Sequence, residues 1–212
     1  EQLLIPLAEE TAAQVVTFGI ENKSGTITVS DIRFSSGMPS FKVTIQEPFN
    51  TLSGERIEPT SFDLELSIPG YHSIYNALTA LVTGLVNDIP LEYVQRGIKN
   101  FRGVERRFQI LYDKEFKVID DLLLNQNNID SCMETINHLD YNELHLVHAL
   151  RGSNGPAHST EIAESLVKWF HELKISKIIL TTASSHVAKK DAVTDEELAA
   201  FLKVMKHSNI EV

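Results

Sequence analysis

Hydrophobic and polar residues alternate along the first third of the chain, and the alternation has a period of two residues. This period is that of a β-strand with one face in a core and the other in water. The segments that follow it, or that are rich in β-branched residues, are 15–20, 26–29, 41–45 and 62–68. Together they predict an antiparallel sheet with one solvent-exposed face.

After Gly70 the pattern changes to that of helices. Hydrophobic residues three and four positions apart form one stripe, which predicts a helix over 72–86. The stripe consists of Leu78, Leu81, Val82 and Leu85. Pro90 opens a second helical segment that runs to Lys99, because proline is favoured at the first position of a helix.

Strands and helices alternate in the second half of the chain. Residues 108–112 and 116–120 are typical of the two strands of a hairpin, and a capping box at 194–197 marks the start of the last helix. The other predicted elements are helices near 127–138 and 159–173 and strands at 144–150 and 177–182. Strands that alternate with helices predict right-handed crossovers and a parallel sheet.

The fold class expected from these patterns is α/β, with a domain boundary near 102–106. The first domain carries the antiparallel strands, and the second is a Rossmann-like βαβαβα unit. The second domain lacks the GxGxxG turn that dinucleotide-binding folds place after their first strand. The sequence therefore argues against a nicotinamide-dependent dehydrogenase.

The composition is that of an ordinary globular protein, with 42% hydrophobic and 23% charged residues among 212. A net charge of −10 argues against non-specific binding to nucleic acid or to anionic membranes. The single cysteine, Cys132, allows no disulfide within the chain and is typical of a reducing, cytoplasmic location. Because the chain begins at Glu1 and ends where another strand is about to start, we expect it to be part of a longer protein.

Polar residues gather at the carboxyl ends of three predicted strands, where open α/β sheets bind ligands. The three groups are Asp120-Asp121, the loop 151–155 with Arg151, and the loop Ala183-Ser184-Ser185-His186. An acid, an arginine and a hydroxyl-rich loop would then meet at one rim. Ordinary turn chemistry is the alternative for each loop, because Gly, Ser and Asn dominate turns.

The helix at 72–86 opens with Gly70-Tyr71-His72-Ser73-Ile74-Tyr75-Asn76-Ala77. This segment resembles the GxHNxxNA motif of the Mur ligases, with Ser73 at the position of the first asparagine. The resemblance implies that Asn76 binds the adenine edge of ATP, and a primary amide suits that edge because it both donates and accepts hydrogen bonds. The alternative is that Asn76 caps a helix or packs in a helical interior.

Two further segments resemble the same family. Arg107 matches a linker arginine that approaches the phosphates of ATP, which a guanidinium binds in a planar fork. Arg106 replaces the family's glycine and Gln109 its glutamate, and a solvated surface arginine is the alternative role of Arg107. Asp121 matches the ribose-binding aspartate of a DYAHxP segment. The next residues, Leu122-Leu123-Leu124, cannot donate hydrogen bonds from their side chains, so we expect them to pack. The resemblance thus predicts one nucleotide cleft lined by Asn76, Arg107 and Asp121.

The acceptor side departs from the family pattern. The family's GxGGxRD loop is present only as 151–155, and 183–186 replaces the DNPR motif of the diaminopimelate-adding branch. We therefore expect a different acceptor. The expected substrate-binding residues are Arg151, Ser184 and His186. The contexts 104–109 and 150–152 are more similar to the Mur-ligase-like proteins of methanogenic archaea, which include the synthetase of a nickel tetrapyrrole coenzyme.

The resemblance implies an ATP-dependent ligase that activates a carboxylate as an acyl phosphate. Residues 1–103 would be the C-terminal part of a P-loop-type central ATPase domain, and residues 104–212 a truncated Rossmann-like C-terminal domain. The expected ligands are ATP, a small-molecule carboxylate, and Mg²⁺ held mainly by residues upstream of Glu1. We expect no catalytic residue and no metal ligand in this chain, and the sequence leaves the oligomeric state open.

Two alternatives to a ligase remain. A degenerate homologue would bind a nucleotide or a partner without catalysis, a possibility that Leu122-Leu123-Leu124 raises. An unrelated two-domain binding protein would match the three motifs by chance.

Overall fold

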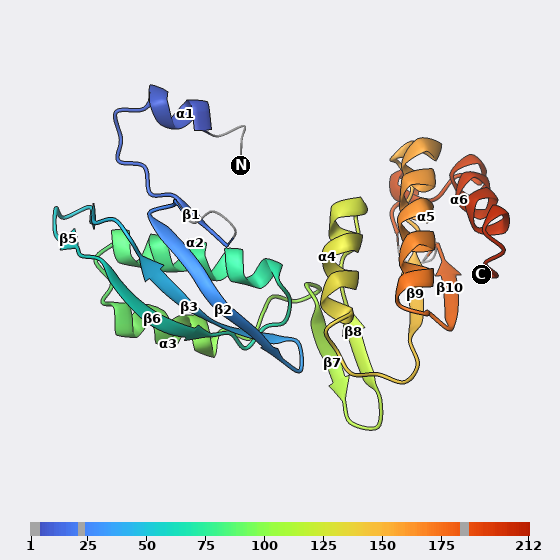
Figure 1. The fold of residues 1–212 in the computed structure, drawn as a ribbon. Coiled ribbons are helices and arrows are strands. Elements are labelled where there is room, and N and C mark those ends of the chain that lie inside the picture. Colours follow the sequence, from blue (N-terminus) through green and yellow to red (C-terminus); the bar gives the residue numbers. More distant parts are fainter. Residues whose placement is uncertain (1–4, 21–23, 183–186) are drawn as a thin grey trace. The chain divides into compact units, whose positions relative to one another are not determined.

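The computed structural model describes residues 5–20, 24–182 and 187–212 of the chain (Figure 1). The chain divides into two compact units, Glu1–Val104 and Glu105–Val212. Both units combine helices with strands, so the predicted α/β class is confirmed. A short helix, α1 (Ile5–Glu10), precedes the strands of the first unit. Among the described residues, no helix is long and apolar enough to cross a membrane.

The first unit is built on a four-stranded sheet with the strand order β1-β2-β3-β6. The strands are β1 (Phe18–Gly19), β2 (Ile27–Ser35), β3 (Met38–Ile45) and β6 (Thr60–Glu65). β2, β3 and β6 pair antiparallel, which confirms the prediction, and β1 pairs parallel to β2. A separate antiparallel pair consists of β4 (Phe49–Asn50) and β5 (Arg56–Ile57).

The alternation in the sequence has the predicted effect on burial. Phe41, Val43 and Ile45 of β3 are buried, and Lys42 between them is exposed. Two helices, α2 (His72–Val86) and α3 (Leu91–Asn100), lie against one side of this sheet (Figure 1). The predicted stripe of α2 packs into the same cluster as these β3 side chains, so one core joins the sheet to its helices.

The second unit begins with the predicted hairpin of β7 (Gln109–Asp113) and β8 (Lys117–Asp120). The elements that follow are α4 (Gln126–Ile136), β9 (His145–Ala149), α5 (Gly155–Glu172), β10 (Lys177–Thr181), the 3-10 turn η1 (Lys189–Asp191) and α6 (Asp195–His207). β9 and β10 are parallel, as predicted. β8 pairs with β7 and not with them, so the parallel sheet of the described residues has two strands rather than three. As a result, Lys117 and Val118 of β8 are exposed, whereas a central parallel strand is covered on both faces.

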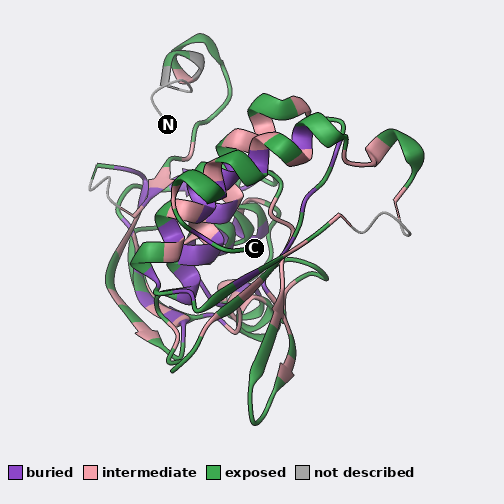
Figure 2. Cartoon of the chain, turned by 90° about the vertical axis from the view of Figure 1, so that its right-hand side faces the viewer, coloured by how far each residue is buried: buried purple, intermediate pink, exposed green. Residues whose placement is uncertain are grey.

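The core of the second unit lies between the helices and one face of β9 and β10. Ile129 of α4, Leu166 of α5 and Phe201 of α6 are all fully buried there. On the opposite face, Val147 and Ile179 are 64% and 41% exposed. Figure 2 shows buried residues on the inner sides of the helices, and a β7–β8 hairpin that is exposed along most of its length.

Candidate functional site

The start of α2 is fixed by interactions that its sequence makes possible. Gly70 has a φ of +97°, a conformation that favours glycine, and its N–H donates to Gly37 O at 3.1 Å. Ser73 is buried, and its hydroxyl donates to Pro69 O at 2.5 Å. Ser73 therefore holds the turn before the helix and does not face solvent.

Asn76 lies one turn further along α2, and it is exposed. No hydrogen bond of its side chain is found in the part of the chain that the structure describes, so it neither caps a helix nor packs in an interior. The neighbouring Tyr75 is 41% exposed and makes an edge contact with Tyr71, with ring centroids 6.4 Å apart. The helix thus presents a primary amide beside an aromatic ring to solvent.

The linker before β7 turns sharply at residues other than glycine. Arg106 has a φ of +59° and Phe108 a φ of +44°. Phe108 is buried in the core of the second unit, and Arg106 N–H donates to Gln109 Oε1 at 3.0 Å. Gln109 therefore stabilises the turn. Between these anchors, the side chain of Arg107 is exposed.

Asp121 follows β8 and is half-buried. Its Oδ1 accepts a hydrogen bond from Leu122 N–H at 2.7 Å. The buried thiol of Cys132 in α4 also interacts with this carboxylate. Burial, and to a smaller extent the charge of Asp121, raises the pKa of the Cys132 thiol above its usual range. The thiol therefore stays protonated and unreactive.

The three leucines after Asp121 pack in part, as predicted. Leu123 lies against the core of the second unit, and Leu124 is 37% exposed. The chain then enters α4 through Asn125, whose side-chain oxygen accepts from Asn128 N–H at 3.0 Å. Ordinary helix capping and core packing therefore account for the segment that replaces the family's polar residues.

Arg151 follows β9, and its side chain is exposed. The Arg151 guanidinium lies 3.6 Å from the carboxylate of Asp191, and Gly152 N–H donates to Asp191 O at 3.2 Å. Because β9 and β10 are parallel, the loops that follow them leave the same end of this sheet. Ser184 and His186, the other two predicted substrate-binding residues, lie outside the described residues.

Asp191 and Glu197 are two residues that sequence reasoning missed at this end of the sheet. Glu197 is 2% exposed, and its Oε1 accepts from Gly155 N–H at 2.8 Å. The capping box in the sequence predicted the bond between Glu197 and Thr194, which is present. The contacts of Asp191 with Arg151 and of Glu197 with Gly155 join distant parts of the chain, and no local sequence pattern indicates them.

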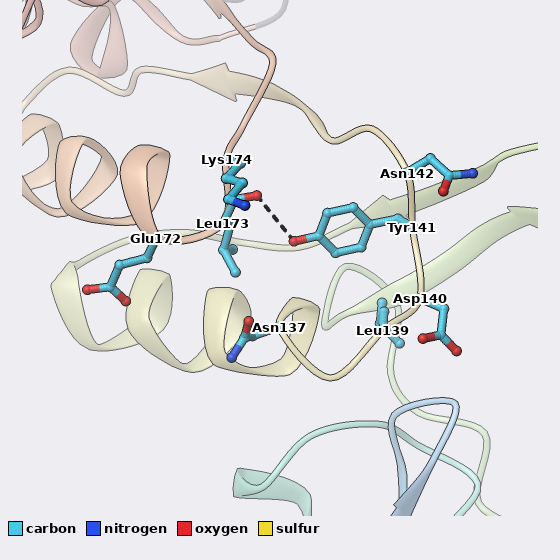
Figure 3. Close-up of a pocket in the computed structure, with 8 residues that line it drawn as sticks. All are labelled: Asn137, Leu139, Asp140, Tyr141, Asn142, Glu172, Leu173 and Lys174. Carbon is cyan, nitrogen blue, oxygen red and sulfur yellow. Dashed lines mark hydrogen bonds between the residues drawn. The ribbon is translucent and has the colours of Figure 1, made fainter.

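A hollow of about 490 Å³ lies at the opposite end of the same two strands (Figure 3). It is lined by residues 137–142, before β9, and by residues 172–174, before β10. The Tyr141 ring extends toward Leu173, and its hydroxyl donates to Leu173 O at 3.4 Å (Figure 3). Glu172 and Asn142 point to opposite sides. Its polar groups do not converge, so we do not assign this hollow as the candidate site.

Metal-ligating side chains do not gather in the described ranges. No group of three or more His, Cys, Asp or Glu residues is placed there to hold a metal ion. Of the predicted nucleotide-binding residues, Asn76 lies in the first unit, and Arg107 and Asp121 lie in the second. A second guanidinium, at Arg151, is already paired with an acid.

Comparisons with known proteins find ligases among the proteins similar to this chain. No protein-family model matches the chain. A UDP-N-acetylmuramate–L-alanine ligase from Clostridium acetobutylicum is 33% identical over 143 residues, which cover 66% of this chain and 28% of that protein. A UDP-N-acetylmuramoyl-L-alanyl-D-glutamate–2,6-diaminopimelate ligase from Halalkalibacterium halodurans is 28% identical over 158 residues, or 74% of this chain and 30% of that protein. The chain thus spans less than a third of the length of either relative.

Solved structures resemble the fold over nearly its whole length. A folylpolyglutamate synthase from Thermotoga maritima matches with a TM-score of 0.67 at 18% sequence identity, over 100% of this chain and 44% of that one. At this identity the match describes the fold alone.

Proposed function

Because this chain belongs to the Mur ligase superfamily, we propose that it is part of an ATP-dependent ligase that activates a carboxylate as an acyl phosphate. The chain supplies the nucleotide lid and the acceptor-binding domain of a cytoplasmic enzyme. Residues 1–103 are the C-terminal part of the central ATPase domain, and residues 104–212 belong to the C-terminal domain. The Mur relatives and the α/β fold support this assignment, because both are those of ATP-dependent ligases.

The observation that carries the proposal is the exposure of Asn76 at the start of α2. It stands in a segment that keeps the family's glycine, histidine, asparagine and alanine, while Ser73 in the same segment is buried and engaged. Asn76 binds the adenine edge, because its amide can donate to the ring nitrogen and accept from the exocyclic amine. Arg107 contacts phosphate oxygens, and Asp121 accepts from the ribose hydroxyls.

The reaction begins when an oxygen of the substrate carboxylate attacks the γ-phosphorus of ATP. The bond between the γ-phosphorus and the bridging oxygen breaks, and ADP leaves. A nucleophile of the second substrate then attacks the acyl carbon, and inorganic phosphate leaves with the bonding electron pair. Mg²⁺ neutralises phosphate charge in such reactions, and we assign it no ligand among the described residues. This chain contributes positioning of the nucleotide.

On the acceptor side, Arg151, Ser184 and His186 bind the second substrate. Within the superfamily we propose a relation to the Mur-ligase-like proteins of methanogenic archaea, with a carboxylate of a nickel tetrapyrrole precursor as one candidate substrate. The loop contexts at 104–109 and 150–152 support this relation. The ion pair with Asp191 holds the Arg151 guanidinium at the end of β9, where a substrate carboxylate can add to it.

A second candidate function is nucleotide or partner binding without catalysis. The packing of Leu123 favours it, because the side chains of 122–124 offer no hydrogen bond to a ligand. Both functions use Asn76 and Asp121, and they differ in whether phosphate is transferred.

Calorimetric titration of the full-length protein with a non-hydrolysable ATP analogue tests the proposal. Asp121→Ala loses hydrogen bonds to a charged group and weakens binding by roughly 10- to 100-fold. Asn76→Ala weakens it by about 2- to 10-fold, because the amide is neutral. Asn127→Ala, at an exposed asparagine in the first turn of α4, is the matched control and binds like the parent. Parent-like affinity of both Asn76→Ala and Asp121→Ala would overturn the assignment.

A further inference from the structure

The N-terminus of α5 lies at the carboxyl end of β9, where open α/β sheets bind anionic groups of ligands. It lacks the usual local caps. The side chain of Asn154, the N-cap residue, makes no capping hydrogen bond, and the first turn contains no acidic residue. The partial positive charge at this helix end therefore has no anion from its own segment.

The missing anion comes from α6. Glu197 Oε1 accepts from Gly155 N–H, the first residue of α5, at 2.8 Å. Its other oxygen, Oε2, accepts from Thr194 N–H at 2.9 Å and from Thr194 Oγ1 at 3.0 Å. One carboxylate thus caps the N-termini of two helices.

The environment keeps Glu197 ionised. Hydrogen bonds from the backbone of Thr194 and of Gly155 lower the pKa of its carboxyl group below the usual range. The carboxylate is also shielded, since Glu197 is 2% exposed. It therefore stands in the place of a bound phosphate or carboxylate, in contact with the main chain.

The loop between β9 and α5 is also fixed by residues that precede α6 in the chain. Arg151 pairs with Asp191, and a Cβ added at Gly152 would lie 2.1 Å from Ala192 O. The backbones of Gly152 and Ala192 are therefore packed so closely that the loop cannot shift alone. Glu197 and Asp191 hold the loop from both of its ends, with the Arg151 side chain exposed.

We propose that Glu197 is a built-in anion that closes the N-terminus of α5 to ligands and leaves the Arg151 side chain as the group that receives an anionic substrate. The part that concerns the substrate rests on the proposed function, and the closure of the helix end does not. Glu197 is thus a specificity-determining residue. It excludes recognition of a phosphate by the main-chain N–H groups at the N-terminus of α5.

Inorganic phosphate, titrated into the ¹⁵N-labelled 212-residue chain and followed by NMR, tests the closure. In Glu197→Ala the helix end is vacated, and the Gly155 amide resonance moves with phosphate and saturates. The parent shows no saturable movement. Glu196→Ala, which removes an exposed charge from the same helix turn, behaves like the parent. No nucleotide enters this experiment, so its failure is distinct from failure of the ligase proposal.

Two results would overturn the inference. One is a saturable shift of Gly155 in the parent, and the other is no shift in a Glu197→Ala variant whose remaining spectrum is native. If Glu197→Ala does not fold, Glu197→Gln replaces it, with hydrogen exchange as the measurement. Exchange at Gly155 is then roughly 10-fold faster than in the parent, because a bond to a charged acceptor is lost. Unchanged exchange at Gly155 would contradict the cap.

Discussion

Both units bury hydroxyl side chains, and among the described residues the second unit also buries titratable ones. Among its described residues, the first unit buries three hydroxyl side chains and no titratable one, and these are Thr26, Thr51 and Ser73. The second unit buries the titratable side chains of His148 and Glu197. A hydroxyl can satisfy a buried hydrogen bond without carrying charge, whereas a buried titratable group couples folding to pH. Buried titratable groups therefore couple the stability of the second unit to pH.

The same contrast holds for the candidate ligand-binding residues. The side chain of Asn76, in the first unit, has no internal hydrogen bond among the described residues. In the second unit, Asp121 already accepts from Leu122 N–H, and Arg151 already pairs with Asp191. The first unit thus presents an exposed amide at Asn76, and the second presents charged groups held in position by their neighbours.

The largest expected effect concerns His148, whose ring stacks on Phe201 at a centroid distance of 5.9 Å. Burial lowers the pKa of His148 from 6.5 to about 4. Above pH 6.5 neither the folded nor the unfolded state holds the proton. Between pH 6.5 and 4 only the unfolded state takes it up, so the free energy of unfolding falls by roughly 3 kcal/mol as the pH falls.

Urea unfolding across this pH range measures the effect, with the tryptophan fluorescence of Trp169 reporting on the second unit. His148→Leu removes the titration and flattens this part of the profile. His145→Gln, at an exposed histidine of the same strand, keeps the parent slope. Identical slopes for the parent and His148→Leu would contradict the assignment of the pH dependence to His148.

The second-largest effect on stability is expected from a substitution of Leu123, which follows Asp121 closely in the chain. Leu123→Ala removes a side chain that packs against the core of the second unit, at a cost of about 2 kcal/mol in the free energy of unfolding. Leu124→Ala, one residue further and 37% exposed, changes it by less than about 0.5 kcal/mol. Thermal melts compare the two variants. Nucleotide affinity stays at the parent value in both, and a loss with Leu123→Ala alone would make Leu123 part of the site.

A substitution of Gly70 tests whether the first unit depends on the left-handed backbone conformation at this position. Gly70→Ala places a side chain at a φ of +97° and lowers the stability of the first unit by about 1–2 kcal/mol. Gly97→Ala is the control, because Gly97 lies inside α3 and an added Cβ meets nothing within 4 Å. This control raises stability by up to about 1 kcal/mol, as alanine favours helices. Effects of the same sign in the two variants would refute the strain at Gly70.

The smallest expected effect concerns the linker. Arg106→Gly relieves a left-handed conformation at φ +59°, but it also adds freedom to the unfolded chain. The two terms nearly cancel, and stability changes by less than about 1 kcal/mol. Arg107→Gly adds the same freedom without that relief, so it is the less stable variant by about 1 kcal/mol. Chemical denaturation of both variants checks the order, and the reverse order would exclude strain at Arg106.

Local patterns in the sequence predicted most of the elements. The alternation at 41–45 located β3, and the stripe in 72–86 located α2 together with the position of Asn76. The prediction for α5 started at residue 159 because Asn154-Gly155-Pro156 has the composition of a loop. The helix in fact begins at Gly155, where Glu197, 42 residues away, caps it.

The wrong sequence predictions have one cause in common. Each concerns a contact between residues that lie far apart in the sequence. The sequence placed β8 in the parallel sheet, but its pairing depends on which strand edges the fold brings together. The ion pair of Arg151 with Asp191 has no local signature either. At the linker, the replacement of glycine by Arg106 was visible in the sequence, and the bond from its N–H to Gln109 was not.

The central proposal is that Asn76, Arg107 and Asp121 bind one nucleotide. An NMR titration of the labelled full-length protein with a non-hydrolysable ATP analogue tests it most directly, followed at the side-chain amide of Asn76 and at the backbone amides of Arg107 and Asp121. The account predicts that all three signals move and that they saturate with the same midpoint. Movement in only one unit, or different midpoints for Asn76 and Asp121, would contradict it.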